Sequence, residues 1–366
     1  SGGGRGRIDE WRVGAAVLAE HPVVGLGFEG YRIGFAEGVD AEYEQRYGRT
    51  FTPDRAHSGF LDIGVTAGLP GMVIYLTGGL ALVVSSITGV RSGPPWLIGI
   101  AGGVVAYLGQ QQFLVPIIEV DGVFWVFAGI LVAATTRRAM ARAIPRGVWI
   151  AGLVLVGAAA AAGGLDIAAD RATRNALELE QRGDRGAAVE RARDGVALRP
   201  DSIRYRFVAA SIAGRDGTGA GYARAVSFID GALEVAPRDP VLLAARAGYR
   251  VDLAVVQRDR ELLSAAVAEW ETLVARDPNH AQFHLELGIA YAVAGRPDDA
   301  EMAWRVAAVL APTSGAPWAN LASLFIDRSD PDAASAALAE LVAREPDSEL
   351  IQPLRIRIDA LGRENG

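Results

Sequence analysis

The 366-residue sequence contains no cysteine and no lysine. The lack of cysteine excludes disulfide bonds, thiolate metal sites and cysteine nucleophiles. All 36 basic residues are arginines, which we attribute to GC-rich coding rather than to function. The net charge is −7 and there is no basic tract, so the composition argues against nucleic-acid binding.

Charge is also nearly absent from one long stretch. Between Ile63 and Ile118 the only formally charged residue is Arg91. Four apolar segments of about 17 to 23 residues begin in or near this stretch, and each is long enough to cross a hydrocarbon core about 30 Å thick. They are Gly68–Val90, Pro95–Leu114, Val120–Thr136 and Gly147–Leu165. The mean hydropathy is +0.21, yet 22% of residues are charged, so we expect a membrane part joined to a soluble part.

The short connectors between these segments predict their orientation. The connector Arg137 to Arg146 contains four arginines and no acidic residue, so we expect it to be cytoplasmic. Alternation places Arg91 on the same side. The connector Pro116 to Asp121, the loop before the first span and everything after Leu165 are then extracytoplasmic. These features predict a multi-pass membrane protein.

The N-terminal part is polar and irregular except for one predicted helix. Ile8 to Glu20 has an apolar stripe with helical spacing, and His21-Pro22 ends it because the residue before proline is disfavoured in the α region. We expect Gly30 to Arg55 to be a polar loop. The chain opens with Ser1 and no signal-like region, so we interpret it as a fragment whose N-terminal part is missing.

Beyond about Asp166 the composition changes to helical repeats. Prolines at 200, 237, 278, 312 and 346 each follow a helical run, at intervals of 37, 41, 34 and 34 residues. Thirty-four residues is the tetratricopeptide (TPR) period. The segment from Ala281 to Pro312 resembles that family, with Leu287-Gly288, Tyr291, Gly295, Ala300 and Ala307 at packing positions. Such arrays present a binding surface whose partner the pattern does not reveal.

Together these patterns predict an all-α fold, with about four transmembrane helices followed by a TPR α-solenoid. The predicted domains are an extracytoplasmic loop at 1–67, transmembrane helices at 68–166 and TPR-like repeats at 167–362.

Three motifs lie between the N-terminus and the beginning of the first apolar segment, in a fixed order. They are Arg7-x-x-x-Trp11, then His21-Pro22-Val23-Val24-Gly25-Leu26-Gly27, then Ala56-His57-Ser58-Gly59-Phe60-Leu61 with Gly68-Leu69-Pro70-Gly71. Their order and spacing over about Arg5 to Thr136 resemble the last large extracytoplasmic loop of the O-antigen ligase family. That family comprises bacterial membrane glycosyltransferases of the ligase and polymerase type, so the resemblance implies a bacterial plasma membrane. The family's earlier transmembrane helices are absent, so we expect this fragment alone to be inactive.

The resemblance implies transfer of a glycan from a polyprenyl diphosphate to an acceptor hydroxyl outside the plasma membrane. Arg7 matches the motif arginine and would bind the diphosphate, for which a guanidinium fork is suited. Arg55 is a second candidate, by its position in the loop only. His57 matches the motif histidine and would accept the hydroxyl proton, or would instead hold a phosphate. No cofactor and no metal are expected.

Each assignment has a structural alternative. His57 could be a structural hydrogen-bond donor, and Arg7 could bind lipid headgroups. Gly25 and Gly27 resemble a phosphate-cradling turn, but no strand precedes them, so turn geometry is favoured. The run Gln110-Gln111-Gln112 could line an acceptor path, although capping of a helix end is the simpler interpretation. His280 and His284 have metal-like spacing without an accompanying carboxylate motif, and His284 occupies a TPR packing position.

We therefore expect a metal-independent membrane glycosyltransferase of the O-antigen ligase type. The alternative is a non-catalytic, membrane-anchored TPR scaffold for cell-envelope assembly. A transporter is disfavoured because the apolar segments contain almost no ionisable residue. The expected partners are the polyprenyl-diphosphate-linked glycan, a glycan or lipid acceptor, membrane lipid, and a protein or polymer on the TPR surface.

Overall fold

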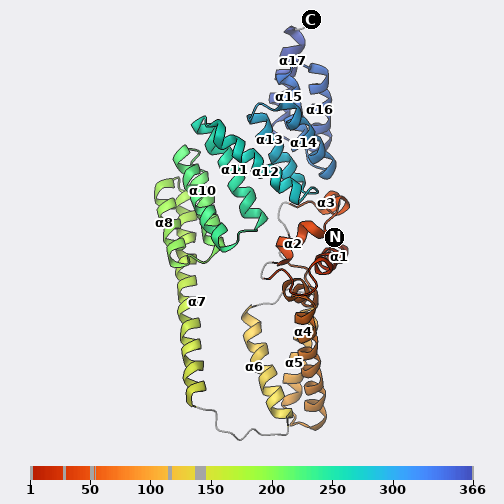
Figure 1. Cartoon of the computed structure of the whole chain (residues 1–366), viewed down its shortest axis with the longest axis vertical. Helices are drawn as coiled ribbons and strands as arrows, with labels where there is room; N and C mark the ends of the chain where they lie inside the picture. The colour runs from red at the N-terminus through yellow and green to blue at the C-terminus, as the bar shows by residue number, and fades with distance from the viewer. Residues whose placement is uncertain are drawn as a thin grey trace. The chain divides into compact units, whose positions relative to one another are not determined.

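A computed structural model describes residues 3–27, 30–49, 53, 55–113, 118–136 and 146–364. All regular structure in this part of the chain is helical, as expected, and it contains no strand (Figure 1). The chain divides into two compact units. The first comprises residues 1–39 and 51–149, and the second comprises residues 40–50 and 150–366.

The first unit contains α1 (Gly3–Glu20), α2 (Gly30–Gly38), α4 (Gly59–Ser92), α5 (Leu97–Gln110) and α6 (Ile118–Thr135). Helices α4, α5 and α6 lie side by side (Figure 1). Their shared core includes Leu97, Val104 and Leu131, which are fully buried. Their outward side chains are apolar as well, and Ile74 is 73% exposed. A long apolar face of this kind is compatible with lipid rather than with water.

Within the described residues, one helix, α4, is long and apolar enough to cross a membrane. Helix α5 and residues 121–135 of α6 are apolar but shorter. The predicted number of about four spans is therefore not confirmed and stays a prediction. The charge count behind the predicted orientation rests mainly on residues 137–145 and 114–117, which lie outside the described residues.

Two element boundaries differ from the expectation. The first apolar helix, α4, starts at Gly59, nine residues before the predicted start at Gly68. Gly68 has a non-helical backbone but does not end the helix, which therefore extends on both sides of it. Helix α7 (Arg146–Gln181) continues through Leu165 without a break.

The expected polar loop Gly30 to Arg55 is wrong in part, since it contains α2 and the short helix α3 (Ala41–Tyr47). Tyr31 and Phe35 are buried and form one apolar face of α2. In the sequence, the charged residues around them favoured a loop over a helix. Asp40 begins α3 by accepting a hydrogen bond of 2.8 Å from the backbone N–H of Tyr43.

The second unit contains α3 and a series of antiparallel helix pairs that starts within α7. The further helices are α8 (Arg185–Leu198), α9 (Ile203–Gly214), α10 (Gly219–Val235), α11 (Pro240–Gln257), α12 (Arg260–Arg276), α13 (Ala281–Val293), α14 (Pro297–Leu310), α15 (Ala316–Asp327), α16 (Pro331–Arg344) and α17 (Ile351–Glu364). Side-chain caps start several of them, including Asp184, Thr218, Asp239, Asp259 and Asp330. Neighbouring pairs pack through alanine-rich cores, as repeat proteins require.

The motif residues of one repeat explain how its two helices approach each other. The indole Nε1 of Trp304 in α14 donates a hydrogen bond of 3.1 Å to the carbonyl of Leu285 in α13. A Cβ atom on Gly288 would lie 2.3 Å from the same Nε1. Gly295 has a φ of 74° in the turn between the helices. Both glycines are therefore required by packing and by turn geometry.

Candidate active site

The break in α4 is the feature on which the N-terminal motifs converge. Gly68 has φ 65° and ψ −169°, which lies outside the helical region, and Pro70 lacks a backbone N–H. The carbonyls of Val65 and Thr66 therefore lose their partners within the helix, as does the N–H of Leu69. Another segment of the chain has to satisfy these three groups.

The motif His21–Gly27 supplies that segment. The N–H groups of Leu26 and Gly27 donate to the carbonyls of Val65 and Thr66, at 2.8 and 2.9 Å. The carbonyl of Pro22 in turn accepts a hydrogen bond of 2.8 Å from the N–H of Leu69. Two sequence motifs that are forty residues apart thus form one backbone-to-backbone joint.

The glycines of this motif have a structural role. Gly25 and Gly27 have φ values of 69° and 81°, and a Cβ on Gly25 would lie 2.6 Å from the carbonyl oxygen of Val65. The N–H groups of Leu26 and Gly27 already donate to α4. This geometry favours the predicted turn over a phosphate cradle.

The residues around His57 are fixed by the start of α4. The N–H of Ala56 donates to the Asp62 carboxylate at 2.8 Å, and the N–H of Asp62 donates to the Ser58 carbonyl at 2.8 Å. Ala56 is fully buried and Ser58 is buried, whereas His57 between them is half-buried. The backbone on both sides is therefore held while the imidazole remains accessible.

His57 itself has a backbone φ of 53°. Non-glycine residues rarely adopt this left-handed region, and such strain costs about 1–3 kcal/mol and clusters at functional sites. The interactions of Ala56 and Ser58 impose it here.

The tautomer of His57 follows from the hydrogen bond that its ring makes within the described residues. Nδ1 lies 3.3 Å from the carbonyl oxygen of Arg55. A carbonyl can only accept a hydrogen bond, so Nδ1 carries the proton and donates. In the neutral imidazole Nε2 then has a lone pair available to accept a proton or a hydrogen bond.

The glutamine run after α5 supports the same turn. The backbone carbonyl of Gln111 accepts a hydrogen bond of 2.8 Å from the N–H of Gly59, one of the unpaired donors at the start of α4. The side-chain amide of Gln112 donates to the hydroxyl of Tyr75 at 2.9 Å. The same amide donates to the carbonyl of Leu108 in the last turn of α5 at 3.2 Å, so these residues cap the end of their own helix as well as the start of α4. A Cβ on Gly59 would lie 3.0 Å from both the Gln111 carbonyl and the Tyr75 hydroxyl.

Arg55, one of the two candidate arginines, accepts the hydrogen bond from His57 through its backbone carbonyl. The side chain of Arg55 is exposed. Arg7 lies on α1, which packs against α4. A Cβ on Gly14 of α1 would lie 3.5 Å from the Ala56 side chain. Arg7 precedes Gly14 by seven residues, so it shares that face of α1, about 10 Å along the axis. The geometry thus directs Arg7 to the same side of α1 as the His57 turn.

Asp62 is a site residue that the motif analysis did not single out. Its carboxylate holds the Ala56 N–H and so fixes the residue before His57. The signal was available, since an acidic residue in the first turn of a helix suits both the unpaired N–H groups and the helix dipole.

The two histidines considered for a metal site lie in the second unit. Nε2 of His284 donates to the carbonyl of Pro278 at 2.9 Å, so that nitrogen is occupied. The ring of His280 stacks on Phe283, with ring centroids 3.8 Å apart. Burial lowers the pKa of His280 to about 3, and the neighbouring charge of Arg49 adds to the effect. Both rings have structural roles in the α12–α13 turn.

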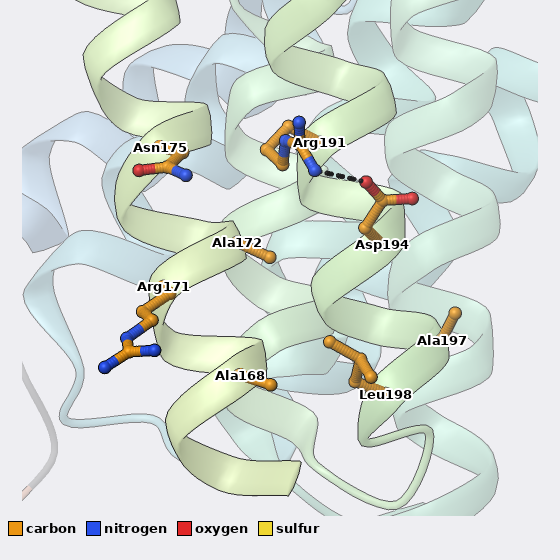
Figure 2. Close-up of a pocket in the computed structure, with 8 residues that line it drawn as sticks. All are labelled: Ala168, Arg171, Ala172, Asn175, Arg191, Asp194, Ala197 and Leu198. Atoms are coloured by element: carbon orange, nitrogen blue, oxygen red, sulfur yellow. Dashed lines mark hydrogen bonds and ion pairs between the residues drawn. The ribbon is translucent and has the colours of Figure 1, made fainter.

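A groove of about 600 Å³ lies between α7 and α8 (Figure 2). Half of its lining residues are alanine or leucine, and the polar half comprises Arg171, Asn175, Arg191 and Asp194. Figure 2 shows Arg191 turned toward Asp194, and the two form an ion pair of 3.0 Å. Because a carboxylate already neutralises Arg191, this arginine is poorly suited to bind a diphosphate.

Comparison with known proteins agrees with both parts of the sequence analysis. Residues 1–76 match the O-antigen ligase family, and residues 251–317 match the tetratricopeptide repeat family. No curated protein shows a significant match to the chain.

Similar solved structures include two described as TPR proteins. TTC0263, a thermophilic TPR protein in Thermus thermophilus, is 20% identical, with a TM-score of 0.42 over 53% of this chain and 98% of that one. MamA 41-end from Desulfovibrio magneticus RS-1 is 18% identical, with a TM-score of 0.39 over 50% and 97%. YrrB, a TPR protein with an unusual peptide-binding site, is 15% identical, with a TM-score of 0.37 over 50% and 90%. The resemblances inferred from the motifs are confirmed by the family matches: residues 1–76 are similar to the O-antigen ligase family, and residues 251–317 are similar to the tetratricopeptide repeat family.

Proposed function

We propose that the protein is a membrane glycosyltransferase of the O-antigen ligase type, and that it transfers a glycan from a polyprenyl diphosphate to an acceptor hydroxyl. The family match at residues 1–76 supports a role in this chemistry and in a membrane. The observation that carries the proposal is the His57 turn. A strained, anchored backbone presents an imidazole whose Nδ1 is committed to Arg55 and whose Nε2 is available.

In the proposed reaction Nε2 of His57 accepts the proton of the acceptor hydroxyl as its oxygen attacks the anomeric carbon. The bond between that carbon and the diphosphate oxygen breaks, and the bonding electron pair leaves with the polyprenyl diphosphate. Arg7 and Arg55 stabilise the departing charge through forked hydrogen bonds to phosphate oxygens. No redox step or further co-reactant is required for the atoms and charges to balance.

The lipid part of the donor would lie against the apolar helices. A cavity of about 280 Å³ between α5 and α6 is lined mainly by apolar residues, including Val104, Phe124 and Phe127. Tyr107 and Gln110 are its polar members, and Gln110 begins the glutamine run that holds the His57 turn. We assign this cavity to a segment of polyprenyl or membrane lipid.

The remaining assignments concern location. We propose four membrane crossings, with the His57 turn and the repeats both outside the plasma membrane. Polyprenyl-linked glycans would then meet the acceptor on that side. The repeats would bind the acceptor, the growing polymer or an envelope protein. The TPR match also favours the alternative function, a membrane-anchored scaffold in which the ligase motifs are only structural.

The test is donor turnover in membrane vesicles that contain the native full-length protein. Incubation with a polyprenyl-diphosphate-linked glycan and an acceptor glycan should release polyprenyl diphosphate and lengthen or ligate the acceptor. The rate should be unchanged by a chelator, because the proposed chemistry uses arginines rather than a metal. Absence of donor turnover in vesicles where the repeats still bind a partner would favour the scaffold instead.

A further inference from the structure

Residues 40–50 belong to the repeat-containing unit, although the chain on either side belongs to the ligase-like unit. This excursion contains α3 and ends seven residues before His57. Two of its charged side chains, those of Glu44 and Arg49, are almost completely buried, with relative exposures of 2% and 0%. Charged residues are rarely buried in this way unless they are paired.

The partner of Arg49 is Asp277, at the turn between α12 and α13. The guanidinium makes two parallel contacts with this carboxylate, Nη1 to Oδ2 at 2.7 Å and Nη2 to Oδ1 at 2.9 Å. Its Nε donates to Oε2 of Glu44 at 2.6 Å. A forked arginine–carboxylate pair is the most geometrically demanding of protein ion pairs, so this contact specifies one orientation.

Glu44 has a second role, at the start of α13. The residue before that helix, His280, makes no side-chain capping bond. Oε1 of Glu44 instead accepts a hydrogen bond of 3.0 Å from the N–H of Ala281. The helix therefore receives its cap from a residue 237 positions earlier in the chain, whereas α11 and α12 are capped by their own Asp239 and Asp259. A carboxylate at this end is also favoured by the helix dipole.

A third contact extends the site to the next helix. The side-chain amide of Gln45 donates to the carbonyl of Val309, near the C-terminal end of α14, at 3.2 Å. The carbonyls of the last helical turn have no partner within the helix. The segment thus uses one unpaired N–H group of α13 and one terminal carbonyl of α14.

We propose that the α12–α13 turn and the C-terminal end of α14 form a peptide-binding site, and that its ligand is the segment Asp40–Arg49 of the same chain. The site recognises one acidic and one basic side chain, Glu44 and Arg49, together with the amide of Gln45. Departure of the segment would leave Asp277 without its cation and α13 without its cap. The repeats therefore hold the loop that leads to His57 instead of serving only as a surface for outside partners.

This proposal does not depend on glycosyltransferase activity, and its test uses none. The chain has no cysteine, so Gln45→Cys with Val309→Cys gives one defined thiol pair. A short bismaleimide should join the two positions within one chain, and the tryptic peptides that carry them identify the product by mass spectrometry. Mixing isotope-labelled and unlabelled chains distinguishes links within a chain from links between copies.

The decisive variant is Arg49→Gln in that background. It should reduce the crosslink yield at least fivefold, because it removes the fork to Asp277 while every residue of the repeats stays in place. The matched control is Arg46→Gln, on the same segment but half exposed, where the yield should be unchanged. An unchanged yield in Arg49→Gln, or links only between copies, overturns the proposal.

Amide hydrogen exchange gives an independent measurement that needs no cysteine. Glu44→Ala should increase the exchange rate of the Ala281 amide at least tenfold, because it loses its acceptor. The Val241 amide, which Asp239 caps at 2.9 Å, should not change. If the Ala281 amide keeps its protection without Glu44, the segment is not the cap of α13 and the proposal fails.

Discussion

Replacing Gly68 by alanine should open the joint between the segment 22–27 and α4. The backbone of Gly68 has φ 65° and ψ −169°, a region that is almost restricted to glycine. A Cβ at this position would lie 2.5 Å from the carbonyl oxygen of Val23 and 2.6 Å from its carbonyl carbon. Both atoms belong to the backbone, so no side-chain rotation can relieve the contact.

Two routes are open to the variant, and they have similar free-energy costs. Keeping the joint requires a strained backbone, at about 1–3 kcal/mol, and a displaced neighbour, at about 1–3 kcal/mol. Undocking instead sacrifices the three backbone hydrogen bonds of Leu26, Gly27 and Leu69, at about 1 kcal/mol each. Either route destabilises the joint by about 3 kcal/mol, which is about a hundredfold in its opening equilibrium.

Amide exchange of the chain in detergent micelles measures this opening directly. In Gly68→Ala the amides of Leu26, Gly27 and Leu69 should exchange about a hundredfold faster than in the unmodified chain. The matched control is Gly78→Ala in the same helix, where a Cβ would meet nothing within 4 Å. It should leave all three rates unchanged. Rates within twofold of the unmodified chain in Gly68→Ala would refute the account of the break.

Three further predictions concern charge. Arg7→Lys should raise the KM for the lipid-linked donor severalfold in a transfer assay, because an ammonium keeps the charge but loses the fork; equal KM values would remove Arg7 from the site. The pKa of His280, lowered to about 3 chiefly by burial, means that the unfolded chain takes up a proton below about pH 6.5 and the folded chain does not. The free energy of unfolding of the repeats should therefore fall by about 2 kcal/mol between pH 7 and pH 5 through this residue, and His280→Asn should show a correspondingly smaller pH dependence in urea titrations. An equal pH dependence in the variant would contradict the buried, neutral ring. Single cysteines at Glu42, Ser92 and Ser348 should react with a membrane-impermeant thiol reagent in intact cells at 42 and 348 only; labelling at 92 would reverse the proposed orientation.

The repeats were predictable because their signals are local and periodic. The spacing of Gly288 and Gly295 reflects helix contact and turn geometry, and both positions have that role in the structure. The Gly68-Leu69-Pro70-Gly71 motif was interpreted as the start of an apolar segment, so the break at Gly68 inside α4 was not predicted. The sequence also does not reveal which segment binds to α4 at this break. The contacts are backbone hydrogen bonds, which do not depend on the side chains of Leu26 or Leu69.

The position of residues 40–50 could not be predicted from the sequence. Arg49 and Asp277 are 228 residues apart, and in the sequence each has the appearance of an ordinary surface charge. The composition of the segment favoured a solvated loop, and only tertiary packing buries Glu44 and Arg49. The motif identified His57, but its tautomer depends on the Arg55 carbonyl, which required the three-dimensional structure.

The central claim is that His57 accepts the proton of the acceptor hydroxyl, and single-turnover transfer tests it most directly. With the native full-length protein in vesicles and saturating donor, His57→Gln should lower the transfer rate at least a hundredfold, because general-base catalysis contributes about 10²–10⁴-fold. Donor binding should be retained, since the diphosphate is assigned to the arginines. His21→Gln is the matched control, because His21 pairs with Glu37 at 2.7 Å rather than belonging to the turn, and its rate should remain near that of the unmodified protein. A normal transfer rate in His57→Gln, or a loss of donor binding that accounts for the whole defect, would contradict the assignment.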